Sequence, residues 1–198
     1  MNDVLKKQII DVIETHKKLI DQLQESSIET LVTAAEAITK AIRQDNTVYI
    51  CGNGGSAADA QHIAAELVGR FERERKPLPA VALSTDTSVI TSIANDYGYE
   101  KVFVKQVEAL IRGGDILWAI STSGTSSNVI AAAELAKKKQ AFVLAFTGNS
   151  SSKLEQIADI CLCANTSSTA RSQEIHQVAY HIICNLVEQS FCEQPKQT

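Results

Sequence analysis

The chain has 198 residues, of which 44% are hydrophobic and 21% charged, as in an ordinary globular protein. A formal net charge of -4 argues against nucleic-acid binding by phosphate neutralisation, and no apolar run approaches the roughly 20 residues that a membrane-spanning helix needs. The N-terminus lacks the apolar core and cleavage site of a signal peptide, so we expect a cytoplasmic protein without nucleic-acid or membrane partners.

Two helices are predicted before residue 45. The second follows Ser27, a residue type that caps helices, and ends before Gln44. The first spans about residues 3–23 and carries apolar residues on more than one side. We therefore expect the N-terminal helices, residues 1–44, to make contacts between subunits. The approximate helical stripe of the first helix consists of Leu5, Ile9, Ile13, Ile20 and Leu23.

Short apolar runs alternate with helical patterns from about residue 45 to 192. The predicted strands are 48–50, 80–83, 116–120, 142–146 and 160–163. The predicted helices are 56–69, 87–95, 100–111, 126–139, 151–158 and 170–191. Continuously apolar strands separated by helices indicate a parallel sheet covered on both faces. We predict a single α/β domain over residues 1–198: a flavodoxin-like, three-layer αβα sandwich with a mostly five-stranded parallel sheet, plus the N-terminal helices.

The five cysteines are odd in number and follow no regular spacing, which is typical of reduced thiols. Cys161 and Cys163 lie two residues apart in an apolar run and would face the same side of a strand. We interpret them as buried small hydrophobic residues rather than as a metal-binding pair.

Two polar loops directly follow predicted strands, where ligands bind in an open parallel sheet. The first, residues 52–56, is Gly-Asn-Gly-Gly-Ser; its glycines permit close backbone approach, and Ser56 can cap the next helix. The second, residues 121–126, combines five hydroxyls, a glycine and a helix N-terminus, which suit a phosphate. Neither loop has the spacing of a Walker or dinucleotide motif. The loops predict a phosphate ester that is not a nucleotide, with simple helix capping as the alternative.

His62 and Glu66 lie four residues apart on a predicted helix and share a face. Taken alone, they are better explained as a surface pair or as a core histidine bonded to its neighbour. On the last helix, Gln173 and His181 are surrounded by apolar residues. If the two helices cross, the four side chains suit a zinc ion, or proton transfer between Glu66 and His181. Two further polar residues of the last helix are interpreted as solvated and without a chemical role: Glu174 and His176.

Four stretches together resemble the phosphoheptose isomerase group of the sugar-isomerase (SIS) domain family. They are residues 52–66, TSIANDYGY at 91–99, ISTSG at 120–124 and TARSQEIHQVAYH at 169–181. The resemblance covers residues from about 28 to 190. It implies interconversion of sedoheptulose 7-phosphate and D-glycero-D-manno-heptose 7-phosphate through an enediol(ate), the first step towards the ADP-heptose of lipopolysaccharide core. It also implies a cytoplasmic homotetramer.

The resemblance further implies one zinc ion per subunit, with Glu66 as the carbon base and His181 as the oxygen acid/base. Some members of the family carry an acidic residue where this chain has Ala170, so any role of that carboxylate must be absent or pass to a residue such as Asp96. The implied zinc ligands are His62, Glu66, Gln173 and His181. The implied substrate contacts are Asn53, Gly54, Gly55, Glu66, Asn95, Asp96, Ser121, Thr122, Ser123, Ser126 and Gln173.

The main alternative is a SIS-domain adaptor that binds the bacterial replication initiator and has no enzymatic activity. That adaptor shares the overall pattern, including the FERER segment found here at residues 71–75. It is expected to lack the glutamate and the second histidine of the catalytic set. Because this chain has both Glu66 and His181, the sequence favours the enzyme.

Overall fold

The computed structural model describes residues 2–192; residues 1 and 193–198 of the predicted domain lie outside the described residues. Five strands form one sheet in the order β2-β1-β3-β4-β5, and every neighbouring pair is parallel. The predicted five-stranded parallel sheet is therefore confirmed. The strands are β1 (Val48–Gly52), β2 (Ala80–Ala82), β3 (Ile116–Ser121), β4 (Phe142–Thr147) and β5 (Ile160–Cys163).

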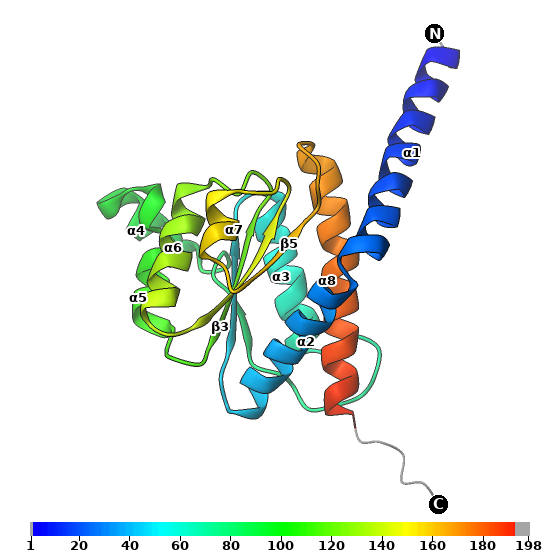
Figure 1. The fold of residues 1–198 in the computed structure, drawn as a ribbon. Coiled ribbons are helices and arrows are strands. Elements are labelled where there is room, and N and C mark those ends of the chain that lie inside the picture. The colour runs from blue at the N-terminus through cyan, green and yellow to red at the C-terminus, as the bar shows by residue number, and fades with distance from the viewer. Residues whose placement is uncertain (1, 193–198) are drawn as a thin grey trace, which may run out of the picture.

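Helices cover both faces of the sheet and complete the predicted three layers (Figure 1). Strand β3 is buried along its whole length, and its side chains alternate between two hydrophobic clusters. Trp118 faces the cluster built with α1 (Asn2–Ser26), α2 (Ile28–Arg43), α3 (Gly55–Val68) and α8 (Thr169–Phe191). Leu117 faces the cluster of the other layer, which includes α4 (Thr87–Tyr97), α5 (Val104–Leu110), α6 (Ser127–Lys138) and α7 (Lys153–Ile157).

The strand order places a topological switch point between β1 and β3. The chain leaves β1 through α3 on one face, whereas it leaves β3 through α6 on the other face. Gly52 pairs with Ile120, so the loops that follow these two strands start side by side. In a doubly wound sheet this divergence opens a crevice at the carboxyl ends of the strands, which is where ligands bind.

Several local predictions are wrong in detail. Ser56 does not cap α3: Gly54, with a positive φ of 55°, is the N-cap, and Ser56 is buried inside the helix. Ser27 is the N-cap of α2, but its side chain makes no capping hydrogen bond. The predicted helix 100–111 divides into a short 3-10 turn (Tyr99–Lys101) and α5. Two cysteines are partly exposed rather than buried: Cys161 and Cys163.

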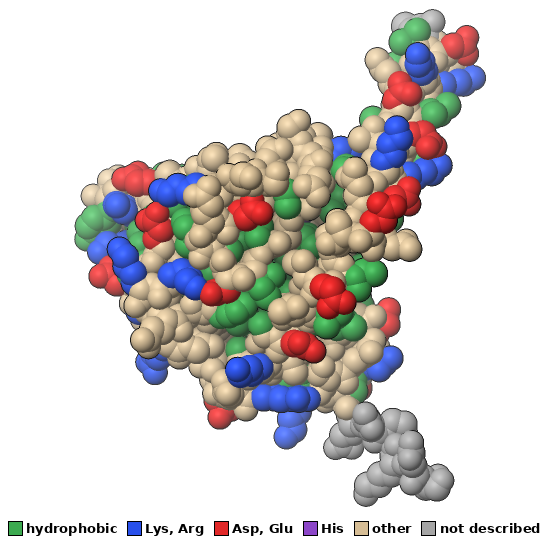
Figure 2. Space-filling view, viewed as in Figure 1, with side chains coloured by type: hydrophobic (Ala, Val, Ile, Leu, Met, Phe, Trp, Pro, Cys, Tyr) green, Lys and Arg blue, Asp and Glu red, His purple; other side chains and the backbone are tan. Residues whose placement is uncertain are grey.

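Helix α1 extends away from the body of the molecule (Figure 1). Hydrophobic side chains lie between its charged residues (Figure 2), and Val4 and Ile9 are 62% and 60% exposed. The helix is joined to α8 at its second half, where Nδ1 of His16 lies 2.9 Å from Oε2 of Glu174. Within residues 2–192, no helix is long and apolar enough to cross a membrane.

Candidate active site

The loops after β1 and β3 line a cleft of about 250 Å³ at the switch point. The two loops that the sequence singled out therefore face each other across one space. The N-terminal turn of α8 closes the cleft from a third side. The lining residues are Asn53, Gly54, Gly55, Ser56, Ile120, Ser121, Thr122, Ser126, Thr169 and Gln173.

The serine loop, residues 121–126, is held by hydrogen bonds within the loop and to its neighbours. Ser121 Oγ donates to Ser126 Oγ at 3.0 Å, and the backbone N–H of Thr125 donates to Ser123 Oγ at 3.2 Å. Gly124 adopts a φ of 65°, and an added Cβ would lie 2.3 Å from Cβ of Ser152. Glycine is therefore required here both by the backbone conformation and by the space. The loop leads into α6, whose N-terminal N–H groups favour an anion.

Asn53, in the loop after β1, is fixed by two residues that the sequence reasoning missed. Its side-chain amide exchanges two hydrogen bonds with Asn128, each 2.9 Å long. The hydroxyl of Tyr99 also donates to Asn53 Oδ1 at 3.1 Å. Asn128 is 3% exposed and Asn53 is partly buried, so this amide pair is a half-buried contact between the two loop regions. Tyr99 ends the TSIANDYGY stretch, so that stretch signalled its location but not its contact.

The structure does not place Asn95 and Asp96 among the residues that line the cleft. Both are exposed on α4, and Nδ2 of Asn95 donates to Oδ1 of Asp96 at 2.8 Å. Their predicted substrate contacts stay a prediction. Tyr99, which follows α4, is the group that reaches the cleft loops from this part of the chain.

Three of the predicted metal ligands converge between α3 and α8. His62 Nε2 lies 2.9 Å from Glu66 Oε1, and the rings of His62 and His181 meet edge to face at 5.0 Å. One ligand atom from each of the three side chains lies within 4.8 Å of the other two. Burial, and then the neighbouring His62, lower the pKa of His181, while Glu66 opposes the shift. Sequence alone could not show whether α3 and α8 meet, and in the structure they do.

This cluster fits a divalent cation. Ligands at the usual 2.0–2.2 Å from a tetrahedral zinc ion lie about 3.4 Å from one another, so small side-chain movements suffice. The donor set of two imidazoles and a carboxylate is one that zinc accepts. Gln173 lies beside the glycine loop, where an added Cβ on Gly55 would be 2.2 Å from its Nε2. Gln173 precedes His181 by eight residues, or about 12 Å of helix rise. Its role as a fourth ligand stays a prediction.

Two further residues beside His62 were not predicted. The hydroxyl of Tyr180 lies 2.9 Å from His62 Nδ1, on the opposite side of the ring from Glu66. Asp59 lies one turn before His62, and its Oδ2 is buried with no hydrogen-bond partner among the described residues. Burial raises the pKa of Asp59 to about 6, although His62 opposes the shift.

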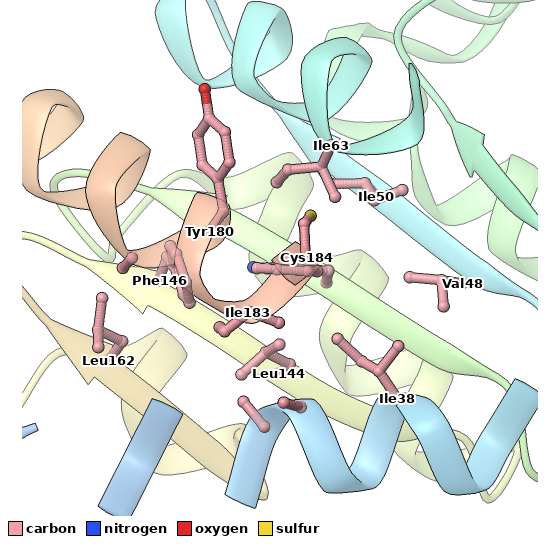
Figure 3. Packing of buried hydrophobic residues seen from close by; sticks show 14 of the residues in the cluster. Ile38, Val48, Ile50, Ile63, Leu144, Phe146, Leu162, Tyr180, Ile183 and Cys184 are labelled. Atoms are coloured by element: carbon pink, nitrogen blue, oxygen red, sulfur yellow. The ribbon is translucent and has the colours of Figure 1, made fainter. Parts of the chain in front are cut away.

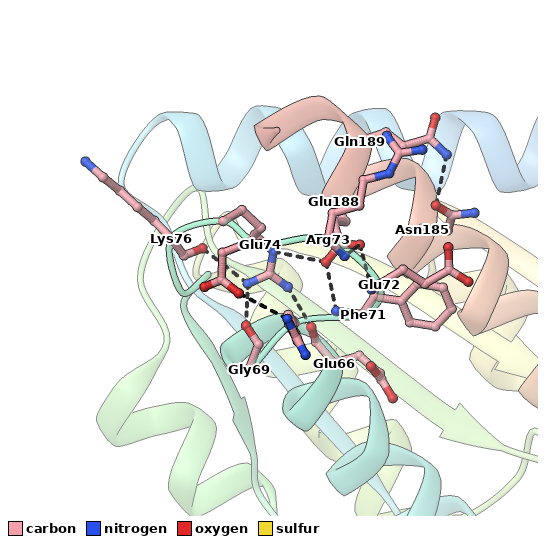
Figure 4. A network of polar contacts seen from close by, with 12 residues as sticks. Glu66, Gly69, Phe71, Glu72, Arg73, Glu74, Lys76, Asn185, Glu188 and Gln189 are labelled. Atoms are coloured by element: carbon pink, nitrogen blue, oxygen red, sulfur yellow. Dashed lines mark hydrogen bonds and ion pairs between the residues drawn. The ribbon is translucent and has the colours of Figure 1, made fainter. Parts of the chain in front are cut away.

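A buried ion pair ties the end of α3 to α8 (Figure 4). Glu188 is fully buried and accepts three backbone N–H groups, from residues 71–73, at 2.8 Å each. Arg75 Nε lies 3.5 Å from the same carboxylate, and its Nη atoms donate to the carbonyls of Glu66 and Gly69. The FERER segment is therefore a loop that fastens the helix carrying Glu66 to the helix carrying His181.

The prediction that His176 is solvated is wrong, because the residue is fully buried. One ring nitrogen, Nε2, lies 3.0 Å from the carbonyl oxygen of Thr147 at the end of β4. Burial lowers its pKa to about 4, although the bond to Thr147 opposes the shift. Glu174 is partly exposed and pairs with His16 and Arg171. His176 therefore helps to attach α8 to the sheet.

The chain is similar to known proteins along nearly its whole length. The family model described as SIS domain matches residues 12–148. A protein of Roseiflexus sp. (strain RS-1) named phosphoheptose isomerase is 47% identical over 193 residues, which cover 98% of each chain. The solved phosphoheptose isomerase of Neisseria gonorrhoeae superposes with a TM-score of 0.88 at 40% identity, covering 93% of this chain and 99% of the other. That of Francisella tularensis gives 0.89 at 35% identity, covering 92% and 97%.

Proposed function

The chain belongs to the SIS domain family, and we propose that it is a phosphoheptose isomerase, interconverting sedoheptulose 7-phosphate and D-glycero-D-manno-heptose 7-phosphate. The observation that carries the proposal is the position of His62, Glu66 and His181 on the two helices whose N-terminal turns line the cleft. In this proposal a sugar phosphate held by the serine loop extends along α3 and α8 towards these side chains. Formation of ADP-heptose for lipopolysaccharide core is the pathway proposed for the product.

The serine loop binds the phosphate in this scheme. Thr122 and Ser126 line the cleft, and the N-terminus of α6 supplies backbone N–H donors. Ser121 and Ser123 hold the loop in shape through their hydroxyls and are the other proposed phosphate contacts. The loop after β1, with Asn53, Gly54 and Gly55, is proposed to bind the sugar hydroxyls. The remaining proposed substrate contacts are Gln173, Asn95 and Asp96.

Aldose–ketose isomerisation moves one proton between C1 and C2 of the open-chain sugar and another between their oxygens. We assign the transfer of the carbon proton to Glu66, whose Oε1 is hydrogen-bonded to His62. We assign the oxygen proton to His181, whose ring lies beside His62 and Glu66 in the same cluster. A bound zinc ion, one per subunit, supplies stabilisation of negative charge that develops on the substrate oxygens. His62, Glu66 and His181 would hold it, with Gln173 as the proposed fourth ligand.

We also propose a cytoplasmic homotetramer in which α1 packs against other subunits. Its support is the row of apolar side chains on α1, several of them about half exposed or more. A single chain leaves this surface in water, whereas a helix–helix interface buries it. Size-exclusion chromatography with light scattering measures the oligomeric state, and a monomer at micromolar concentration would contradict the proposal.

The decisive experiment is turnover of sedoheptulose 7-phosphate by the purified chain, followed by formation of the aldose. Glu66→Gln is expected to abolish turnover while the melting temperature stays within a few degrees of the wild-type value. Glu74→Gln, on an 85%-exposed side chain, is the matched control and should retain full activity. Absence of turnover both with and without added zinc would reject the isomerase. Tight capture of the replication initiator by such an inactive chain would favour the adaptor instead.

A further inference from the structure

Tyr180 lies on α8 directly before His181, and its side chain is 1% exposed. Its ring packs in the hydrophobic cluster, while its hydroxyl points out of the cluster towards α3 (Figure 3). There the hydroxyl meets His62 Nδ1 at 2.9 Å, and the two rings are edge to face with centroids 5.4 Å apart. Phenylalanine would fill the same core space, so packing does not explain the oxygen atom.

The contact can serve either neutral form of His62, because a hydroxyl can donate to Nδ1 or accept from Nδ1–H. A neutral imidazole has one N–H donor and one acceptor nitrogen. Without a cation, the Tyr180 hydroxyl can donate to Nδ1 while Nε2–H donates to Glu66. For Nε2 to offer its lone pair to a cation, the proton must lie on Nδ1. The Tyr180 oxygen is then the acceptor for that Nδ1–H.

A hydroxyl that accepts from His62 needs a new acceptor for its own proton. Asp59 supplies one on the same face of α3, three residues before His62. Its Oδ2 is buried and has no hydrogen-bond partner within the described part of the chain.

We propose that Tyr180 is a positioning residue: when a divalent cation binds, its oxygen accepts from Nδ1–H of His62, so that Nε2 faces the cation, and Asp59 accepts the Tyr180 proton. The inference rests on the proposed function, because it assigns an orienting role at the same site. Protons balance in this change: the His62 proton leaves Nε2 and one is taken up at Nδ1. The hydroxyl turns from Nδ1 to Asp59, and the Nε2 lone pair becomes available to the cation.

The test is Tyr180→Phe, which removes the oxygen and keeps the ring. Zinc affinity of the purified full-length chain is measured at fixed pH by competition with a chelating indicator. Loss of a hydrogen-bond partner behind a metal-binding histidine typically weakens affinity by about 10- to 100-fold, and that loss is expected here. Imidazole ¹⁵N shifts of His62 provide a second readout, independent of activity. They should change from Nε2–H to Nδ1–H when zinc binds the wild-type chain, whereas Tyr180→Phe should give a mixture without zinc.

Asp59→Ala is the second variant; it removes the proposed acceptor of the Tyr180 proton and serves as the test if Tyr180→Phe fails to fold. It should weaken zinc binding without changing the packing around Tyr180. Tyr97→Phe, which removes a hydroxyl from a 59%-exposed side chain, is the control and should bind zinc like the wild type. Unchanged zinc affinity and an unchanged His62 tautomer in Tyr180→Phe would overturn the positioning role alone. A wild-type chain that binds no zinc would instead remove the cation from the proposed function, and this role with it.

Discussion

The buried pair of Glu188 and Arg75 gives the most quantitative prediction. In Glu188→Gln the side chain keeps its shape but loses its charge, and one of its two oxygens becomes an NH₂ donor. The three backbone N–H groups of residues 71–73 now use both carboxylate oxygens, one through Oε1 and two through Oε2. In either orientation of the amide, at least one N–H faces another donor. Arg75, with a side chain that is 1% exposed, also loses its counter-charge.

The expected loss of stability follows from these contacts. Breaking a buried ion pair by removing one partner costs about 3–5 kcal/mol. Arg75 keeps its bonds to the carbonyls of Glu66 and Gly69, so the lower end of that range, about 3 kcal/mol, applies. For a chain of this length each kcal/mol lowers the melting temperature by about 2–4 °C, so a fall of about 6–12 °C is expected.

The assay is thermal unfolding followed by circular dichroism, at equal protein concentration because assembly can raise the apparent stability. Glu74→Gln is the control on the same loop, since its carboxylate is exposed and pairs with Arg70 at 3.2 Å. Its effect should stay within about 0.5 kcal/mol, as for other surface changes. Adding Arg75→Met to Glu188→Gln should cost less than the sum of the single changes, because neither charge is then left alone. A Glu188→Gln chain as stable as the Glu74→Gln control would refute the reasoning.

Three other changes test separate parts of the structure. Gly124→Ala should lower the free energy of unfolding by about 1–2 kcal/mol from the positive φ alone, and it should raise the KM for the sugar phosphate. Gly113→Ala, where an added Cβ makes an ordinary contact at 3.4 Å, should change neither the stability nor the KM. His176 has a pKa of about 4 in the folded chain against 6.5 when unfolded, so the unfolded chain binds more protons between these values. Stability should therefore fall as the pH falls from 6.5 to 4, and unfolding scans across this range should show a smaller fall for His176→Gln. Dialysis against a chelator should abolish turnover and lower the melting temperature, and added zinc should restore both; full activity of a chain shown to be metal-free would contradict the metal centre.

The sheet was predictable because its three central strands, β1, β3 and β4, are largely buried. Each strand is a short run of apolar residues between helical patterns, which located the strands, although the predicted ends differ from the observed ones by up to two residues. Which strand pairs with which was not readable, since that order depends on the direction of each crossover. The position of the two loops after β1 and β3 followed from the strands. Their closeness came from the strand order, which brings Gly52 opposite Ile120.

The sequence did not reveal the contacts between side chains that lie far apart along the chain. Glu188 contacts residues 115–117 positions away, and Tyr180 contacts His62 across 118 positions. Each of these side chains looks unremarkable in its local sequence, because nothing within four residues explains its burial. Capping was also misjudged at Ser56, since Gly54 can adopt the positive φ that starts α3 and serine rarely does.

Polar residues on the buried side of α8 explain how the helix aims its functional side chains. Five residues at intervals of four all lie below 2% exposure, and four of them hydrogen-bond to a different neighbouring segment. These bonds reach the loop after β5, the end of β4, α3 and the loop after α3, so the helix cannot rotate about its axis without breaking several of them. Gln173 and His181 each come directly after one of these five residues. Gln173 therefore faces the cleft, and His181 faces the cluster with His62 and Glu66. The row consists of Ser172, His176, Tyr180, Cys184 and Glu188.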